Sequence, residues 1–311
     1  MSSWRATSKS GSLKRLNSAV PWAAVGWFIK GALTIQAPLF ISSRSHQIGR
    51  STLNVVVCGK VIPASTVTIE IDSNTKRMVR KGVPHELDPA AASAVEEGLR
   101  LIEKHGGTVT LVTMGTSDAT IGIRNALAMG AASAVHILDD AVAGSDTLGT
   151  AKLLAAAIKK QEFDLVICAT ESSDSYSGIV PGQIAYFLGV PPVTFAKEIT
   201  VDGNQITIKR QSETGYDVVE STLPALVACS SGINEPRYPQ LKGIMAAKKK
   251  EIKVYKAVDL GLSPDEVGEK GAREKVLTIG RPAKRQAGKA VTDEGEGGKQ
   301  IADFLAEIKV I

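Results

Sequence analysis

Leu53-Asn54-Val55-Val56-Val57-Cys58 is a short, nearly continuous apolar run, and it indicates the fold class. A strand with one solvated face alternates polar and apolar residues, whereas a strand buried on both faces reads as an unbroken apolar run. Strands of the second kind belong to parallel sheets that carry helices on both sides. The run therefore predicts a buried strand over 53–58, and the sequence downstream of it should supply the covering helices.

Downstream of this strand, helix and strand signals alternate. Asp88-Pro89 offers an N-cap followed by proline at the first helical position, apolar residues then recur at helical spacing, and Gly106-Gly107 ends the helix. Further strands are predicted over 108–114, 134–138 and 164–170, and further helices over 118–129 and 148–161. This alternation predicts an α/β fold, a mostly parallel sheet flanked by helices.

The second half of the chain has a different pattern. Asp202-Gly203-Asn204 is a hairpin signal between two predicted strands, and two more strands are expected over 218–222 and 225–230. Past residue 246 the sequence is rich in lysine and loop-like, with a short final helix predicted over 298–308. We therefore expect an α/β domain over 53–245 and a C-terminal arm over 246–311 that rests on another surface.

The N-terminal segment 1–50 is rich in serine, arginine and lysine and contains no acidic residue. Its apolar stretch Ala19–Ile41 is interrupted by two prolines and a lysine, so it lacks the run of about 20 apolar residues that a membrane span needs. Three interpretations stay open: translated upstream sequence with the true start near Leu53, an organellar transit peptide, or a poor membrane or signal segment. On each, 1–52 is expected outside the fold. The expected location is the bacterial cytoplasm, or the mitochondrial matrix if the segment is a transit peptide.

Composition excludes several classes of protein. The 311 residues are 43% hydrophobic, enough to bury one large core. The net charge of +5 comes largely from the N-terminus, and the body shows no basic stripe with aromatics, so nucleic-acid binding is not expected. Cys58, Cys168 and Cys229 lack close spacing, which predicts buried free thiols rather than a disulfide framework or a zinc site. The four histidines are scattered, so no metal site is expected.

The segment from Thr170 to Gly178 is a candidate ligand loop, because it follows a buried strand and precedes a helix expected to start near Val180. Ligands of parallel sheets bind beyond the carboxyl ends of the strands, and the N–H groups at a helix start favour phosphate. The carboxylate of Glu171 or Asp174 suits ribose hydroxyls. An ordinary βα loop rich in turn formers explains the same residues equally well.

Catalytic motifs are missing from the sequence. It contains no GxGxxG fingerprint, no Walker-type glycine-lysine loop and no Gly-x-Ser-x-Gly elbow, and the serines of 172–177 have no evident histidine partner. The residues present favour binding over bond cleavage, so we expect no catalytic residue and no enzymatic activity of its own.

Residues 234–251 read NEPRYPQLKGIMAAKKKE. This stretch closely resembles the signature of electron-transfer flavoprotein β subunits, in which an NEPRY segment leads into an apolar turn and a lysine run. The resemblance extends over 53–311 and includes the opening strand with Gly59–Pro63 after it. It implies a fold similar to adenine-nucleotide α-hydrolases and a heterodimer with an α subunit that holds most of a shared FAD. It also implies that the β subunit binds AMP, or a second FAD, and that electrons arrive from acyl-CoA or other flavin dehydrogenases, as in fatty acid β-oxidation, and leave for a membrane-linked quinone oxidoreductase or another acceptor.

The resemblance also assigns site residues by position. Nucleotide contacts are implied for Val57, Cys58, Asp88, Pro89, Ala90, Ala91, Met114, Ala169, Thr170, Glu171, Ser172, Ser173, Asp174, Ser175, Tyr176, Ser177, Gly178, Ile179 and Val180. Docking onto dehydrogenases is implied for Leu241, Ile244 and Met245. An exposed apolar cluster beside lysines suits a transient interface with an acidic partner, although a buried turn next to a solvated lysine run is the alternative.

Two functional alternatives stay open. One is a stand-alone adenine-nucleotide-binding regulatory module, which has no use for the arm over 246–311 or for the NEPRY segment. The other is a nucleotide-cleaving enzyme of the same fold, which requires a phosphate-binding motif after the first strand. Gly59-Lys60-Val61-Ile62-Pro63 stands at that position and does not fit such a motif.

Overall fold

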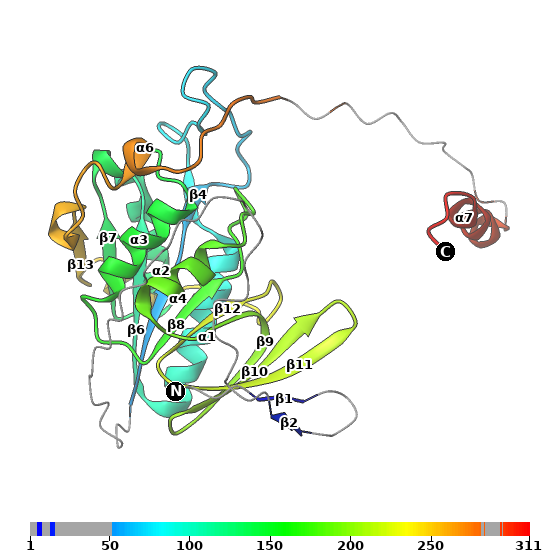
Figure 1. Ribbon diagram of the computed structural model, residues 1–311, viewed down its shortest axis with the longest axis horizontal. Coiled ribbons are helices and arrows are strands. Elements are labelled where there is room, and N and C mark those ends of the chain that lie inside the picture. Colours follow the sequence, from blue (N-terminus) through cyan, green and yellow to red (C-terminus); the bar gives the residue numbers. More distant parts are fainter. Residues whose placement is uncertain (1–4, 8–12, 16–51, 281–282, 284–292, 294) are drawn as a thin grey trace, which may run out of the picture. The chain divides into compact units, whose positions relative to one another are not determined.

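The computed structural model describes residues 5–7, 13–15, 52–280, 283, 293 and 295–311. It divides into two compact units, 1–275 and 276–311, and each is described by itself. The first unit is a large sheet with helices on both faces (Figure 1). Its strands are β1 (Arg5–Thr7), β2 (Leu13–Arg15), β3 (Leu53–Cys58), β4 (Val61–Pro63), β5 (His85–Leu87), β6 (Gly107–Met114), β7 (Ser133–Ile137), β8 (Leu165–Ala169), β9 (Pro192–Asp202), β10 (Gln205–Ser212), β11 (Gly215–Thr222), β12 (Ala225–Cys229) and β13 (Ile252–Tyr255).

The helices of the first unit are α1 (Pro89–His105), α2 (Thr120–Met129), α3 (Thr147–Ile158), α4 (Val180–Leu188), α5 (Leu241–Ala247) and α6 (Gly268–Gly271), and short 3₁₀ turns lie at Ser117–Ala119, Asp140–Val142 and Val258–Leu260. Capping explains where three of them start. The carboxylates of Asp88 and Asp146 accept hydrogen bonds from backbone N–H groups in the first turns of α1 and α3, and α1 and α4 both carry proline in the first turn.

The strands of the large sheet follow the order β13-β7-β6-β3-β8-β12-β9-β10-β11-β1-β2. The seven from β13 to β9 run parallel to one another, and the rest continue antiparallel. This arrangement confirms the predicted α/β class with a mostly parallel sheet. From β3 the chain moves outward through β6 to β7 on one side, then returns to β8 on the other, so the sheet has a topological switch point between β3 and β8.

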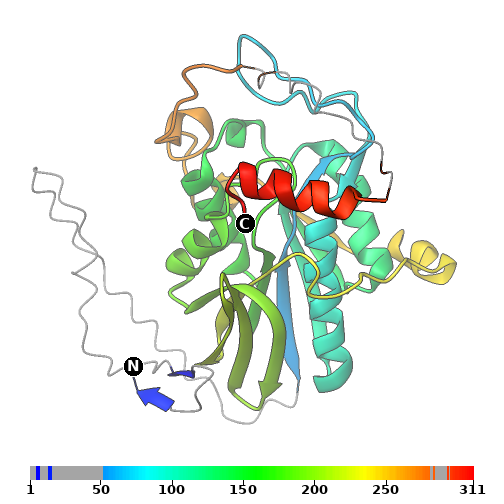
Figure 2. The same cartoon turned by 90° about the vertical axis from the view of Figure 1, so that its right-hand side faces the viewer.

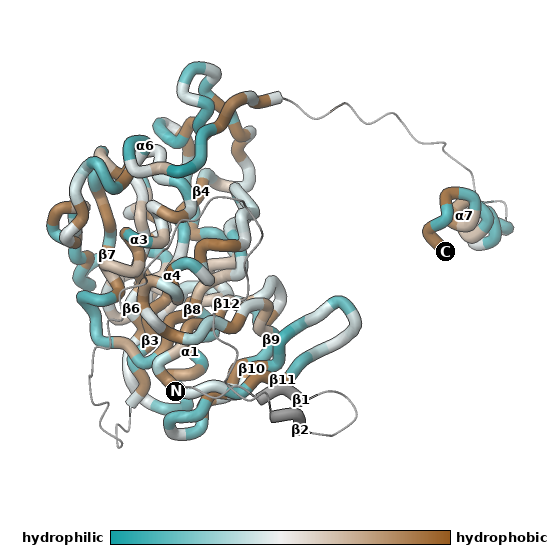
Figure 3. Tube along the Cα trace, in the orientation of Figure 1, coloured by the Kyte–Doolittle hydropathy of each residue, from teal (hydrophilic) through white to brown (hydrophobic). Residues whose placement is uncertain are grey.

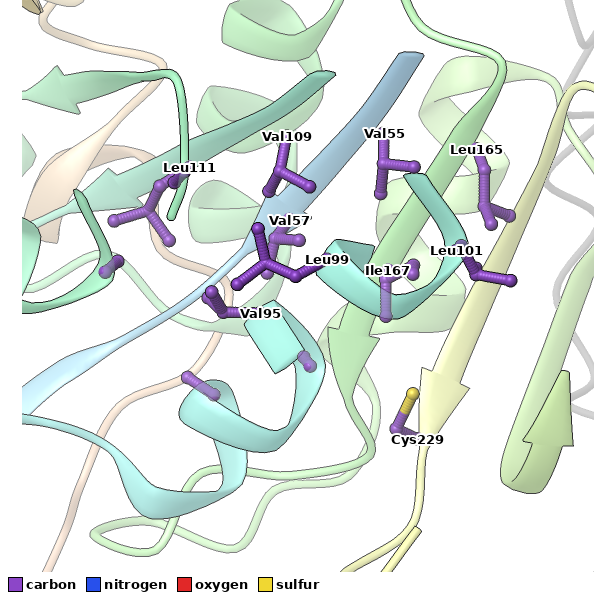
Figure 4. Close-up of a cluster of buried hydrophobic side chains, with 14 of the residues drawn as sticks. Val55, Val57, Val95, Leu99, Leu101, Val109, Leu111, Leu165, Ile167 and Cys229 are labelled. Atoms are coloured by element: carbon purple, nitrogen blue, oxygen red, sulfur yellow. The ribbon is translucent and has the colours of Figure 1, made fainter. Parts of the chain in front are cut away.

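Both faces of the sheet are buried, as the opening apolar run predicts. Val55 and Val57 pack with α1 and α2 on one face, whereas Val56 packs with α3 and α4 on the other. Figure 4 shows Val95 and Leu99 of α1 lying over the first of these faces. Hydrophobic segments gather in the central strands in Figure 3, and the projecting β10–β11 hairpin is hydrophilic at its end. Val55, Val56 and Val57 thus each meet apolar side chains on alternate faces, which is why this part of β3 lacks alternation.

Two segments of the first unit differ from the sequence expectations. Residues 252–255, expected in a loose arm, form β13 and pair in parallel with β7, and the division between the two units lies after Lys275. At the other end, β1 and β2 pair with each other and with the outer edge of β11. The remaining residues up to 51 lie outside the described part of the chain, so the expectation for 1–52 stays a prediction there.

The second unit, 276–311, contains the helix α7 (Gly297–Glu307). This helix agrees with the final helix predicted over 298–308. Its apolar residues Ile301, Phe304 and Leu305 recur at spacings of three and four and so share one side of the helix.

Candidate nucleotide-binding site

A cavity of about 1100 Å³ lies beyond the carboxyl ends of the central parallel strands. Its walls include the residues that follow β3, β6, β7 and β8, together with the first turns of α1, α3 and α4. The switch point between β3 and β8 creates this crevice, because the connections from the two strands lead to opposite faces of the sheet. The cavity therefore lies where a sheet of this topology is expected to bind a ligand.

Eleven of the residues implied by the resemblance line this cavity: Cys58, Asp88, Ala91, Met114, Ala169, Thr170, Glu171, Ser172, Ser175, Ser177 and Val180. The others do not contribute to its wall: Val57, Pro89, Ala90, Ser173, Asp174, Tyr176, Gly178 and Ile179. Val57 is fully buried in the core and Tyr176 is mostly exposed, so these two point away from the cavity for opposite reasons.

The candidate loop 170–178 is fixed at two places. Its start is anchored by Thr170, whose backbone N–H and hydroxyl both donate to the carbonyl of Cys229 at the end of β12. Its middle is tied to α1, because the carboxylate of Asp88 accepts hydrogen bonds from the backbone N–H of Ser173 (2.8 Å) and from its hydroxyl (2.7 Å). Asp88 is 1% exposed. Loop and helix cap are therefore held as one structure.

Asp174 binds two cations from other parts of the chain. Its carboxylate pairs with Lys60 Nζ (2.6 Å) and with an Arg80 guanidinium nitrogen (2.6 Å), and its side chain is 2% exposed. Lys60 Nζ also donates to the hydroxyls of Ser172 and Ser175. Burial by itself would raise the pKa of Asp174, but the hydrogen bonds and charge of Lys60 and the hydrogen bond of Arg80 lower that pKa to about 2. Asp174 thus organises the cations around the loop instead of facing a ligand.

The helix that follows the loop leaves backbone donors available at its start. The N-cap of α4 is Ile179, whose side chain makes no capping hydrogen bond to the first turn. The next two residues, Val180 and Pro181, line the cavity. A helix N-terminus carries partial positive charge, and Lys60 and Arg80 add full charges nearby. Together with the serine hydroxyls, these groups make this end of the cavity suited to a phosphate.

Sequence reasoning missed part of the cavity wall. One missed group consists of three basic side chains and a histidine from residues 60–85: Lys60, Arg77, Arg80 and His85. Another is the connection after β7, where Asp139, Asp140 and Asp146 line the wall. The second group could have been found, because it follows a predicted parallel strand just as the loops after β3, β6 and β8 do. The first had no local signal.

The thiols of Cys58 and Cys168 lie side by side in the cavity wall, since these residues are direct partners across β3 and β8. A hydrogen bond between the thiols and burial both raise the pKa of Cys58, and burial raises that of Cys229. All three cysteines are free. Within the described residues, no cluster of three or more His, Cys, Asp or Glu side chains could hold a metal ion.

The NEPRY segment is bound to the outer side of α1. The Asn234 side-chain amide donates to the carbonyl of Ser93 (3.0 Å) and to the carboxylate of Glu97 (3.0 Å). The Arg237 guanidinium pairs with Glu96 (2.7 Å) and with Glu103 (2.5 Å), which lie about two turns apart on the same face of the helix. The arginine lowers the pKa of Glu96 against the opposing effect of burial. This set of bonds explains why the segment carries asparagine and arginine three residues apart.

The segment continues into α5, where a turn was expected, and α5 packs on α2. Gly243 makes this contact possible, because a Cβ there would lie 2.4 Å from the carbonyl oxygen of Ala128. The Arg124 guanidinium donates to the carbonyls of Ala247 and Lys250, and Lys250 Nζ donates to the carbonyls of Leu127 and Ala131. Lys250 is therefore a structural cap on the C-terminus of α2 and is not part of a freely solvated lysine run.

Leu241, Ile244 and Met245 project from α5 into solvent, with exposed fractions of 76%, 44% and 57%. Lys242, Lys248 and Lys249 are exposed around them. The buried-turn alternative for these three apolar residues is thus excluded by their exposure. The short helix α5, packed on α2, presents them as a small hydrophobic patch with a basic rim, the composition of a transient protein interface.

None of the helices in the described part of the chain combines the length and hydropathy needed to cross a bilayer. Residues 75–260 match the family model described as "Electron transfer flavoprotein domain". The chain is 41% identical to the electron transfer flavoprotein subunit beta of Mycobacterium leprae over 264 residues, which covers 83% of this chain and 99% of that protein. It is 39% identical to the subunit beta of Thermoanaerobacterium thermosaccharolyticum, over 77% of this chain and 92% of that one. It is 36% identical to the caffeyl-CoA reductase-Etf complex subunit CarD of Acetobacterium woodii, over 77% and 92%.

The family-model match begins after β3 and covers β5 to β13, most of the cavity wall and α5, so it includes most of the candidate site and the exposed apolar patch. The alignments cover nearly the whole length of these relatives and about four fifths of this chain. This chain belongs to the electron-transfer flavoprotein β-subunit family, and its role is electron transfer.

Proposed function

We propose that this chain pairs with an electron-transfer flavoprotein α subunit and passes electrons from flavin dehydrogenases, acyl-CoA dehydrogenases among them, to a quinone oxidoreductase or another acceptor. The observation that carries the proposal is the exposed patch of Leu241, Ile244 and Met245 on α5, a helix that packs on α2. A protein that only relays electrons needs contact surfaces and a bound cofactor rather than an acid, base or nucleophile. Since the relatives above are bacterial, we place it in the bacterial cytoplasm.

The redox FAD shared with the α subunit supplies the electron chemistry when bound, and this chain contributes to its position through the heterodimer. We propose that α7 belongs to that interface, because its apolar residues lie on one side of the helix and no residue of α7 is buried. A helix of this kind gains stability by laying its apolar face on another surface.

The cavity suits an adenine nucleotide. Lys60, the hydroxyls of Ser172 and Ser175 and the start of α4 would hold phosphate, and the acids on the wall would accept hydrogen bonds from ribose hydroxyls. The cavity volume of about 1100 Å³ lies just above the range of roughly 300–1,000 Å³ that is usual for ligand pockets. Either AMP or a second FAD therefore fits.

The test is to co-express the full chain with its α subunit, purify the complex, release the bound nucleotides and identify them by chromatography. One FAD and one AMP per heterodimer would support a conventional carrier. Two FAD would support the same role with a second flavin in this cavity. A chain that forms no complex and carries no flavin would overturn the proposal and favour a solitary nucleotide-binding module.

A further inference from the structure

Residues 64–84, which connect β4 to β5, contribute Arg77, Met78 and Arg80 to the wall of the cavity. In Figure 2 this segment, drawn in light blue to cyan, runs above the end of the sheet where the central strands finish. It leaves the body after Pro63 and returns at His85, where β4 and β5 pair antiparallel. Both ends of the segment are thus joined at one side of the cavity. We call residues 64–84 the strap.

The strap has internal order. Its two arms are bound by Ala64 N–H to Pro84 O (2.9 Å) and by Val79 N–H to Glu70 O (2.9 Å). The tip is a tight turn around Asp72, whose carboxylate accepts from the backbone N–H groups of Asn74 and Thr75. Because these hydrogen bonds join its two arms, the strap moves as one body about its base at β4 and β5. To move the strap away from the cavity, only the contacts that it makes with the rest of the protein beyond this base need to break.

Two ion pairs hold the strap to opposite sides of the cavity. Arg80 pairs with Asp174 (2.6 Å) in the loop that follows β8. Arg77 pairs with Glu269 of α6 (2.6 Å), and its guanidinium lies so close to Gly144 that a Cβ at that glycine would collide with it. Gly144 also has φ of +82°, which glycine adopts without strain. The strap thus spans the cavity from the loop after β8 to the loop after β7.

We propose that the strap retains the nucleotide and that the Arg77–Glu269 and Arg80–Asp174 pairs are the two latches that set its release rate. The inference rests on the proposed function, because it requires a nucleotide in this cavity. The two carboxylates, of Glu269 and Asp174, belong to the body of the protein, so each pair ties the strap to a different side of the cavity. A nucleotide beneath the strap is retained while both pairs persist. Glu269 is exposed and Asp174 is buried, so added salt weakens the first latch and has little effect on the second.

The exposed latch permits a charge-swap test on the complete heterodimer. Arg77→Glu and Glu269→Arg each place like charges together, and the double variant restores an ion pair in the reverse sense. The probe is radiolabelled AMP bound to the complex and chased with unlabelled AMP, or FAD followed by its fluorescence if the complex contains two FAD. We expect each single variant to accelerate release at least about threefold at low salt and the double variant to return close to the wild-type rate.

Lys270→Glu is the matched control, since Lys270 neighbours Glu269 and forms an exposed pair with Asp265, away from the strap. It changes the local charge as much as Arg77→Glu does and should leave the release rate unchanged. A second variant, Arg80→Gln, removes the buried latch and should accelerate release about tenfold, with the extra rate independent of salt.

The possible results distinguish a failure of the strap proposal from a failure of the proposed nucleotide site. Release rates that stay within twofold of wild type in Arg77→Glu and Arg80→Gln, with nucleotide still bound, would overturn the strap and leave the proposed function intact. Faster release that the double charge swap does not reverse would also overturn it, since the pair would then not be the cause. A wild-type complex that binds neither AMP nor a second FAD would remove the nucleotide site and the strap together.

Discussion

Asp88, which lines the cavity, binds Ser173 of the loop after β8, and through this contact the N-cap of α1 also fixes the candidate nucleotide loop. One carboxylate accepts from the backbone N–H of Ala90 in its own helix and from both the N–H and the hydroxyl of Ser173. A single side chain therefore links the start of a helix to a loop that follows a different strand.

This link makes Asp88→Ala a sensitive change. The variant loses a helix cap and leaves the Ser173 N–H without its partner, so we expect the free energy of unfolding to fall by about 2 kcal/mol. Nucleotide content of the purified heterodimer should fall as well. The comparison is Ser173→Ala, which removes only the hydroxyl donor. Urea denaturation should show a loss for Ser173→Ala no more than half as large; equal losses would mean that the loop contact and not the cap dominates.

Acid stability should depend on Asp174. Its pKa of about 2 in the folded protein lies below the ordinary value of 3.8, so the carboxylate contributes stability above pH 4. That contribution is lost as the pH falls from about 4 to about 2, because the folded state must then protonate a group that it holds charged. The free energies of unfolding of wild type and Asp174→Asn, measured by urea denaturation, should differ by about 2 kcal/mol at pH 6 and converge near pH 2. A difference that does not change with pH would contradict the assignment.

Leu241→Ala should slow electron delivery by a dehydrogenase without lowering FAD content. Leu241 is the most exposed of the three patch residues, so truncation leaves the fold intact, and loss of a central apolar anchor lowers the transfer rate about tenfold. Ile121→Ala serves as the control, since Ile121 is 62% exposed at the opposite end of α2 from the contact with α5. The measurement is reduction of the heterodimer's flavin by a dehydrogenase with its substrate. Equal rates for Leu241→Ala and wild type would rule out the docking role.

Two glycines in helices should respond differently to an added methyl group. Gly243→Ala forces a Cβ to within 2.4 Å of the Ala128 carbonyl oxygen, so α5 must move off α2, and we expect a loss of about 2 kcal/mol together with slower electron delivery. Gly182→Ala places its Cβ in open space within α4 and should be neutral or slightly stabilising. Thermal unfolding of the two variants checks this contrast. A stable Gly243→Ala protein with normal transfer would show that the close packing of α5 is unnecessary.

Local pattern was sufficient to predict the central elements. The strand predicted over 53–58 has the same bounds in the structure, and the helix predicted after Asp88 runs over Pro89–His105. Both depend on information carried within the segment itself, namely an unbroken apolar run and a cap followed by helical spacing. The cavity position followed from the same elements, since topology places it at the strand ends.

Long-range contacts explain what the sequence did not reveal. Arg77 and Arg80 look like solvated charges in a polar excursion, and their roles appear only when the fold brings Glu269 and Asp174 to them. Lys250 belongs to a lysine run by composition but caps α2 in space. β13 is four residues long and follows those lysines, so its pattern was too short to separate from a loop.

The place of β13 has a consequence for synthesis. Among the described strands of the sheet it is the last to leave the ribosome, and it pairs with the outer edge of β7, made far earlier. Until then β7 presents unpaired backbone donors and acceptors, the kind of edge on which nascent chains aggregate. A chain that stops within the docking segment, after α5 but before residue 252, would therefore carry nearly the whole sheet and still be prone to associate with other unfinished copies. The helix α5 and the strand that covers the edge of β7 are thus translated one directly after the other.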